Sequence, residues 1–388
     1  YDVAGWTLPM QLGVEVVELR APLPANDSVV PAAPPATEAR LLCIRGSTGE
    51  YWVSHDLRNT RSYQLAMRAL RRGQRVRVVA ADPAAGGAHR ARVPSGSLVE
   101  EQPYGGGTTS ATCAPPFGGR PRIADALPAG RTLASAPRIA LYKPWTANMD
   151  EGWTRWVLEQ FEIPFRNVSD SAVKAGRLRD QFDVLIVPDM SLRDIRSGMA
   201  DSLVPARYAG GLGASGIDAI RTFVGSGGTL VLLDRASELA TAELGVPAKL
   251  ITVPRQRSER TSDRRADTAA LRGSLFAPGS VLRVLVNSTH PVAWGMPDTA
   301  AVYFTNSVTF DVAPRAAARV IARYPERSED VLLSGYLEGG AAIAGKAAAL
   351  DAPVGRGRVI MFGFRPQHRG QSYGTFRMLF NALLFGGG

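Results

Sequence analysis

The stretch that most constrains the fold spans residues 138–161 and reads RIALYKPWTANMDEGWTRWVLEQF. It begins with a short apolar run typical of a buried strand, and Pro144 and Asn148 then mark a turn. Apolar residues follow at the spacing of one helix face: Trp153, Trp156, Val157 and Phe161. Strand, loop and helix in this order open a βαβ unit. Ligands of such folds bind at the carboxyl ends of strands, so the pattern predicts a pocket rim over residues 143–151.

The pattern continues along the chain after this unit. IPFRNVS, DVLIVPD and TLVLLD read as strands separated by helices, one over 171–182 and another with Ile217, Ile220, Phe223 and Val224 on one face, and a further helix begins near Arg235. The nearly continuous apolar run of DVLIVPD is typical of a parallel sheet. Beyond the loop at 255–272 the strand patterns follow one another without helices, until a final helix starts near Tyr373. The sequence therefore predicts an α/β fold with a mostly parallel sheet and an antiparallel edge.

The chain before this domain divides by composition. Residues 1–22 contain one β-branched run and read as a strand at the end of an upstream structure, and 23–39 form a Pro/Ala linker. A small mixed α/β unit is predicted over 40–103, with two strands, a helix that ends at Gly73 and two further strands. A Gly/Pro-rich connector over 104–137 leads into the main domain, residues 138–388.

Charge and hydropathy bear on the class of partner. The net charge is +10, but the cations are spread along the chain, and the densest run, RQRSERTSDRR at 255–265, is interrupted by Glu259 and Asp263. A solvated loop explains that run better than a phosphate-binding patch. No run of 18 apolar residues occurs in the sequence. We therefore expect neither nucleic acid nor a membrane as a partner.

Two cysteines, Cys43 and Cys113, are 70 positions apart and neither belongs to a CxxC pair. This spacing excludes a cysteine-rich zinc module. A disulfide and two separate buried thiols are both compatible with the sequence.

Several segments together resemble a known arrangement. KPWTANMDEGWTRWVLEQFEIPF, YAGGLGASGIDAIRTFVGSGGTLVLLD, THPVAWGMP and GRGRVIMFGFRPQHRGQSYGTFRMLFNALL are similar to the carboxy-terminal region of large bacterial zinc carboxypeptidase proteins, the carboxypeptidase A-like metallopeptidases. In those proteins a domain similar to class I glutamine amidotransferases follows the peptidase domain. YDVAGWTLPMQLGV resembles the junction just after that peptidase domain.

The resemblance carries several expectations. It implies a flavodoxin-like, amidotransferase-like fold for residues 138–388, and it implies that residues 1–22 are the tail of an upstream peptidase domain. That domain would be a partner within the same polypeptide and would hold the zinc. The resemblance also implies a secreted or periplasmic protein.

Zinc peptidase chemistry is missing from this chain. A carboxypeptidase zinc site needs an HxxE pair, a distant His and a general-base Glu. None of the four histidines has Glu three residues later: His55, His89, His290 and His368 are followed there by Arg58, Arg92, Ala293 and Gln371. We expect no metal and no cofactor in this chain.

Amidotransferase chemistry needs a nucleophilic Cys on a tight strand-to-helix elbow, a His that activates it and a Glu that orients the His. The corresponding elbow holds Asp234, with Ser237 shortly after it, and His368 follows the last strand near the expected His. A carboxylate at a strand end more often caps the next helix or pairs with Arg. These residues therefore predict that the chain is not catalytic by itself, and the resemblance implies that it is an accessory region of the carboxypeptidase-like protein. The alternative is a stand-alone hydrolase or amidase that uses Asp234 or Ser237 with His368.

Binding is the remaining class of function. Mixed charges and one aromatic side chain follow the ends of the predicted parallel strands and would meet at one sheet edge. They are Lys143, Trp145, Asp150, Glu151, Asp189, Arg365, His368 and Arg369, beside Asp234. Such a set suits a peptide or a small polar ligand, and it equally suits an internal ion-pair network with a docking interface. The glycine-rich segment 210–216 does not directly follow a strand and so lacks the placement of a dinucleotide motif.

Overall fold

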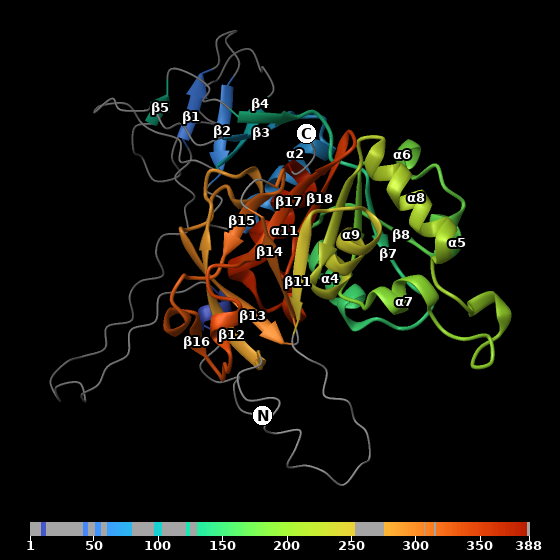
Figure 1. Cartoon of the computed structure of the whole chain (residues 1–388). Coiled ribbons are helices and arrows are strands. Elements are labelled where there is room, and N and C mark those ends of the chain that lie inside the picture. The colour runs from blue at the N-terminus through green and yellow to red at the C-terminus, as the bar shows by residue number, and fades with distance from the viewer. Residues whose placement is uncertain are drawn as a thin grey trace, which may run out of the picture. The chain divides into compact units, whose positions relative to one another are not determined.

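The computed structural model describes residues 9–12, 42–45, 51–55, 60–79, 97–102, 122–124, 130–252, 275–305, 307–313 and 316–385 (Figure 1). The chain forms two compact units. The larger unit comprises Tyr1–Gly13 and Ala136–Gly388, and the smaller unit comprises Val14–Ser135.

The smaller unit is a mixed α/β structure, as the sequence predicts. Its six-stranded sheet has the order β5-β1-β2-β4-β3-β6. The strands are β1 (Leu42–Arg45), β2 (Tyr51–His55), β3 (Val76–Val79), β4 (Leu98–Gln102), β5 (Arg122–Ala124) and β6 (Gly130–Leu133). Helix α2 (Arg61–Arg71) buries Tyr63, Met67 and Leu70. The two outer strands, β5 and β6, come from the Gly/Pro-rich stretch 104–137.

The larger unit is built on five parallel strands. These are β7 (Ile139–Tyr142), β8 (Arg166–Val168), β9 (Val184–Val187), β10 (Thr229–Leu233) and β18 (Gly357–Phe362). They lie side by side in the order β8-β7-β9-β10-β18, and every neighbouring pair is parallel. Numbered along the chain, this is the order 2-1-3-4-5 of flavodoxin-like folds. The fold class expected from the sequence, a flavodoxin-like and amidotransferase-like sheet, is therefore confirmed.

An antiparallel region continues the sheet beyond β18. The path continues through β17 (Ala347–Val354), β15 (Arg319–Arg323), β12 (Pro278–Val286) and β13 (Thr299–Thr305). Off this path, β11 (Ala248–Thr252) pairs with β14 (Val308–Val312), β14 also pairs with β17, and β16 (Leu332–Ser334) pairs with β12. The predicted antiparallel edge is confirmed, although β11 and β14 were not expected from the sequence.

Helices cover both faces of the parallel sheet. On one face, α4 (Met149–Gln160) and α11 (Tyr373–Phe385) meet where the ring of Phe161, just after α4, lies 4.9 Å from that of Phe380. The other face carries α5 (Asp170–Lys174), α6 (Leu178–Gln181), α7 (Leu192–Ser197), α8 (Gly213–Gly225) and α9 (Glu238–Glu243), and Figure 1 shows α5 to α8 grouped together. Alternate strand residues such as Leu230 and Leu232 belong to the core beneath this second group.

Three local predictions are wrong. The helix expected over 171–182 is two short helices, because Gly176 and Arg177 adopt positive φ values of 73° and 54° between α5 and α6. The helix expected from Arg235 begins as a 3-10 turn, η2 (Asp234–Ser237), before α9. Residues 9–12, predicted as part of a strand, are helical, and the Gln11 side chain accepts a hydrogen bond from Ser372 at 3.3 Å.

The buried face of α4 also differs from the prediction. Its buried apolar residues are Val157 and Leu158, whereas Trp156 is 39% exposed. The indole of Trp156 lies against Gly370, where an added Cβ would sit 2.6 Å from the ring. Trp156 therefore packs against the loop after β18 and not against the sheet.

Candidate functional site

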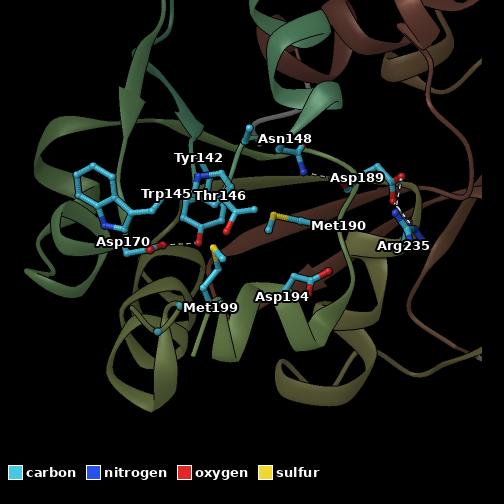
Figure 2. A pocket seen from close by; sticks show the side chains of 15 residues that line it. Tyr142, Trp145, Thr146, Asn148, Asp170, Asp189, Met190, Asp194, Met199 and Arg235 are labelled. Carbon is cyan, nitrogen blue, oxygen red and sulfur yellow. Dashed lines mark hydrogen bonds and ion pairs between the residues drawn. The ribbon is translucent and has the colours of Figure 1, made fainter. Parts of the chain in front are cut away.

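A pocket of about 200 Å³ lies at the carboxyl edge of the parallel sheet. Its walls come from the loop 144–148 after β7, from Asp170 after β8, from residues between 189 and 199 after β9, from the glycines at 210–211 and from Arg235 after β10. The chain reverses its direction of strand addition between β7 and β9, and ligands of open α/β sheets bind at such a switch point. We name this cavity the switch-point pocket (Figure 2).

The apolar part of the wall includes one exposed aromatic side chain. Trp145 is 49% exposed and packs edge-on against Tyr208, with 4.9 Å between the ring centroids. Met190 lies between the two ends of the pocket in Figure 2, and Met199 lies at one of them. An exposed indole on a pocket rim offers a flat apolar surface to a ligand.

Asn148 fixes the loop that carries Trp145. Its Oδ1 accepts a hydrogen bond from the backbone N–H of Glu151 at 2.8 Å and so caps α4. Its Nδ2 donates to the carbonyl oxygen of Asp189 at 3.0 Å. One side chain thus ties the start of α4 to the end of β9, and the loop between β7 and α4 is held over the pocket.

Tyr142 and Asp170 form one end of the pocket. The Tyr142 hydroxyl donates a short hydrogen bond to Oδ1 of Asp170. Both side chains are buried, at 1% and 4% exposure. Burial and the neighbouring carboxylate raise the pKa of the Tyr142 hydroxyl well above its usual value, so Tyr142 stays protonated and acts as a donor.

Asp189 and Arg235 form the opposite end (Figure 2). The guanidinium of Arg235 donates to both carboxylate oxygens of Asp189, from Nε at 2.9 Å and from Nη2 at 3.0 Å. This bidentate arrangement, with Asp189 as its largest cause, raises the pKa of Arg235 above its ordinary value. Asp189 is buried while the Arg235 side chain is 40% exposed, so the pair presents a guanidinium edge to solvent.

Arg365, from the loop after β18, joins the ends of three other segments. Its guanidinium lies 3.5 Å from the Asp150 carboxylate, 3.6 Å from that of Asp189 and 3.3 Å from that of Asp234. It also donates to the carbonyl oxygen of Thr305 at 3.2 Å. This arrangement, the Arg365 network, is an internal ion-pair network of the kind anticipated as the alternative to a binding site.

Asp234 occupies the strand-to-helix elbow after β10 with a positive φ of 51°. Its side chain is fully buried, and its oxygens accept from the Ser307 hydroxyl at 2.7 Å and from the Val308 N–H at 3.2 Å. Burial, with a smaller contribution from Asp189, raises the pKa of Asp234 well above the usual Asp value. Of the two roles expected for this side chain, the pairing with Arg is observed, through Arg365.

The other two candidate catalytic residues face elsewhere. The Ser237 hydroxyl donates to the carbonyl oxygen of Phe362 at 3.3 Å. His368 stacks on Tyr303 at 4.0 Å, and burial followed by the charges of Arg365 and Arg369 lowers its pKa to about 3. Within the described part of the chain, no hydrogen bond or ion pair joins any two of Asp234, Ser237 and His368. The side chain that reaches the elbow from the loop after β18 is Arg365.

The structure separates the eight predicted binding residues into groups. Trp145 and Asp189 line the pocket, and Asp150 and Arg365 connect to it through the Arg365 network. Four others do not line it: Lys143 and Arg369 are exposed, Glu151 is buried 3.7 Å from Arg155, and His368 is buried against Tyr303.

Sequence reasoning missed Asp170, Asp194 and Arg235 as pocket residues. Asp170 follows the second strand by two positions, so the rule that selected Asp189 and Asp234 also applies to it. Gly210 and Gly211 belong to the glycine-rich segment singled out in the sequence, and a Cβ at Gly211 would lie 2.6 Å from the carbonyl oxygen of Ile195. Close backbone packing at the pocket wall accounts for this glycine.

Among the described residues, no group of three or more His, Cys, Asp or Glu side chains is placed to hold a metal ion. A search of the same residues finds no helix that is long and apolar enough to span a membrane. The pairing of Cys43 and Cys113 concerns side chains outside the described residues.

No protein-family model matches the sequence, and no curated protein matches it. Among solved structures, the chain is similar to a protein described as ThuA-like from Bacteroides uniformis, with 11% identity, a TM-score of 0.34 and coverage of 63% of this chain and 92% of that chain. A protein described as a component of GMP synthase from Thermoplasma acidophilum matches with 9% identity, a TM-score of 0.36 and coverage of 63% of this chain and 94% of that chain.

An exo-beta-1,4-mannosidase from an Opitutaceae bacterium matches with 13% identity, a TM-score of 0.35 and coverage of 64% of this chain and 36% of that chain. At such TM-scores these matches add nothing to the fold class that the strand order defines.

Proposed function

We propose that this chain is a non-catalytic accessory region that binds a peptide or a small polar ligand in the switch-point pocket. The proposal rests mainly on the burial and the hydrogen-bond partners of Asp234 at the strand-to-helix elbow. Asp234, where an amidotransferase-like enzyme needs an exposed nucleophile, is fully buried and held by Ser307, Val308 and Arg365. A nucleophile has to reach its substrate, and a carboxylate in this position cannot.

The open pocket supports a binding function, in contrast to the buried side chain of Asp234 at the elbow. The pocket is open at the switch point, has an exposed indole on its rim and a buried carboxylate at each end. Ligand sites combine apolar walls with a few fixed polar groups, and this cavity has both. No contact favours the alternative hydrolase, since the hydroxyl of Ser237 is bonded to a backbone carbonyl and His368 is stacked on Tyr303.

The wider role we propose comes from the resemblance described above. In this proposal the chain follows the peptidase domain of a secreted or periplasmic zinc carboxypeptidase-like protein, docks on that domain or shapes access to it, and contains no zinc itself. Determining the reading frame upstream of Tyr1 tests this role. We expect an HxxE motif with a later His and Glu, and an upstream sequence without them would end the accessory proposal while leaving the binding proposal intact.

Two measurements test binding without catalysis. A library of small polar fragments and dipeptides, screened by ligand-observed NMR, should give hits that disappear in Ala147→Phe. This substitution fills the pocket from an exposed residue on its wall. Glutamine, ester and amide hydrolysis should stay at background. Hydrolysis that the purified protein shows and Asp234→Asn loses would overturn the non-catalytic assignment, and an absence of pocket-dependent hits would overturn the binding assignment.

A further inference from the structure

We infer that the switch-point pocket takes a ligand that carries a protonated amine, and that Asp170 receives this ammonium group. The inference rests on the proposed binding function and narrows it to one chemical class: a small primary amine with an apolar or flat body. The argument combines the lack of a cationic partner for the Asp170 carboxyl group, the lining of the pocket and its size.

Asp170 is a buried carboxylate without a cation. Its side chain lies in the pocket wall with 4% of the residue exposed. Among the described residues, its side chain has one hydrogen-bond partner, the Tyr142 hydroxyl, which donates to Oδ1. Within the described part of the chain, neither Lys, Arg nor His lies within ion-pair distance of Asp170, and Oδ2 has no partner.

This lack of a cation distinguishes Asp170 from the other buried carboxylates of the same sheet edge. Asp189 is paired with Arg235 and Arg365, and Asp234 with Arg365. A buried carboxylate is costly unless a positive charge and hydrogen bonds compensate it. A ligand ammonium supplies both at once, because it has three donors and a full charge.

The charged side chains that line the pocket also favour a cationic ligand. Three carboxylates, Asp170, Asp189 and Asp194, line the pocket with one guanidinium, that of Arg235, which already serves Asp189. Asp194 is exposed, and its carboxylate accepts a hydrogen bond from the Ser191 hydroxyl at 2.6 Å. Among the described residues, Asp194 has no cationic partner. The excess of negative charge disfavours an anionic ligand and attracts a cationic one.

The apolar lining suits the body of such an amine. In Figure 2, Trp145 and Met199 lie at the same end of the pocket as Tyr142 and Asp170, and Met190 lies between them and the other end. An aromatic face beside an ammonium adds a cation–π attraction, and thioethers fit irregular apolar groups. A volume of about 200 Å³ accommodates a group the size of an amino acid or a small aromatic amine.

The test uses a matched set of probes on the full chain: phenethylamine, its N-acetyl derivative, which has the same ring without the charge, and 3-phenylpropanoate, which has the opposite charge. Binding is measured by saturation-transfer NMR and calorimetry. Phenethylamine should bind at least about tenfold more tightly than the other two, since a charged hydrogen bond is worth about 1.5–3 kcal/mol.

The variant Asp170→Asn removes the charge, keeps the shape and still accepts from Tyr142. It should reduce phenethylamine binding by roughly tenfold or more. The matched control is Asp218→Asn, which removes an exposed carboxylate of α8 outside the pocket and should leave binding unchanged. Circular dichroism of both variants checks that they are folded.

The outcomes separate the two proposals. Equal binding of the amine and its acetyl derivative, preference for the anion, or undiminished binding to Asp170→Asn would each overturn the inference. If fragments other than amines bind and Ala147→Phe abolishes them, the amine class is wrong and the binding function stands. If phenethylamine does not bind at all, the inference fails, and the broader fragment screen decides the binding function separately.

Discussion

Asp234 lies at a sharp strand-to-helix elbow, but its side chain is buried there. Its φ of 51° is the strained geometry of a strand-to-helix elbow, which favours glycine and costs a non-glycine residue about 1–3 kcal/mol. The strain normally serves to expose a side chain, yet here the side chain is buried and bonded to Ser307. The pairing with Arg365 and the hydrogen bond from Ser307 hold the carboxyl in this buried position.

We predict that Asp234 makes stability fall as pH rises. Because burial raises its folded pKa, the unfolded chain releases the proton first, above a pH of about 4. The favourable contribution is complete below that pH and is lost as pH rises through the folded pKa, at up to about 1.4 kcal/mol per pH unit. Urea unfolding of Asp234→Asn between pH 4 and 8 should show a shallower decline than the native protein. The exposed Asp218→Asn should retain the native slope, and an unchanged slope in Asp234→Asn would contradict the assignment.

His368 should have the opposite effect on the pH dependence of stability, because its contribution is lost as the pH falls. Its folded pKa is lowered to about 3, first by burial and then by Arg365 and Arg369, whereas the unfolded chain takes up this proton near pH 6.5. The stabilising contribution is therefore complete above about pH 6.5 and is lost as pH falls toward 3. The variant His368→Phe keeps a ring against Tyr303 and removes the titration. Its unfolding free energy should fall less than that of the native protein between pH 6.5 and 4.5, and parallel losses would contradict the prediction.

At the scale of elements, the loop after β18 organises the sheet edge. It follows the last parallel strand and delivers one guanidinium to carboxylates that come from α4, β9 and η2. Arg365 is largely buried, with 12% of its side chain exposed, so these ion pairs are poorly screened by solvent. The pocket lies beside this network, lined by residues that follow β7, β8, β9 and β10.

Removing that guanidinium should be strongly destabilising. Arg365→Gln leaves Asp150 and Asp234 without their cation, and breaking a buried pair costs about 3–5 kcal/mol. Chemical denaturation should show this loss, and adding Asp234→Asn should recover part of it, giving a coupling energy in a double-mutant cycle. The exposed neighbour Arg369→Gln is the control. Additive effects of the two substitutions would show that the pair does not act as a unit.

At the scale of the whole molecule, the net charge is +10. Many arginines of the larger unit are matched by carboxylates close in space. The pairs include Arg138 with Asp183, Arg196 with Glu243, Arg221 with Asp218 and Arg327 with Glu329. Exposed pairs add little stability, but they do reduce the local potential.

We therefore predict weak, non-specific binding to nucleic acid. The protein should elute from heparin at low salt, and its affinity for duplex DNA should fall only slightly with added salt, because few phosphates are neutralised. A fluorescence-anisotropy salt titration measures this slope. A steep slope with retention at physiological salt would indicate a basic patch that the described residues do not show.

Much of the fold was predictable because its signals are local. The continuous apolar runs of β9 and β10, the helix face of Ile217, Ile220 and Phe223 and the change to consecutive strands after residue 275 follow from side-chain periodicity alone. Local backbone breaks were not predictable in this way. The positive φ of Arg177 that divides α5 from α6 occurs at a residue with no special preference for it.

The sequence by itself determined the fold class, the lack of an HxxE motif in this chain and the placement of Asp234 at the end of a parallel strand, since residue type and spacing are enough for each. Only the tertiary structure decided which polar side chains meet. It paired Arg365 with Asp234, turned Ser237 toward Phe362 and left Asp170 in the pocket wall without a cation. The physical reason is that ion pairing depends on distances between strand ends that are far apart in the chain, and these distances are set by the order of the strands.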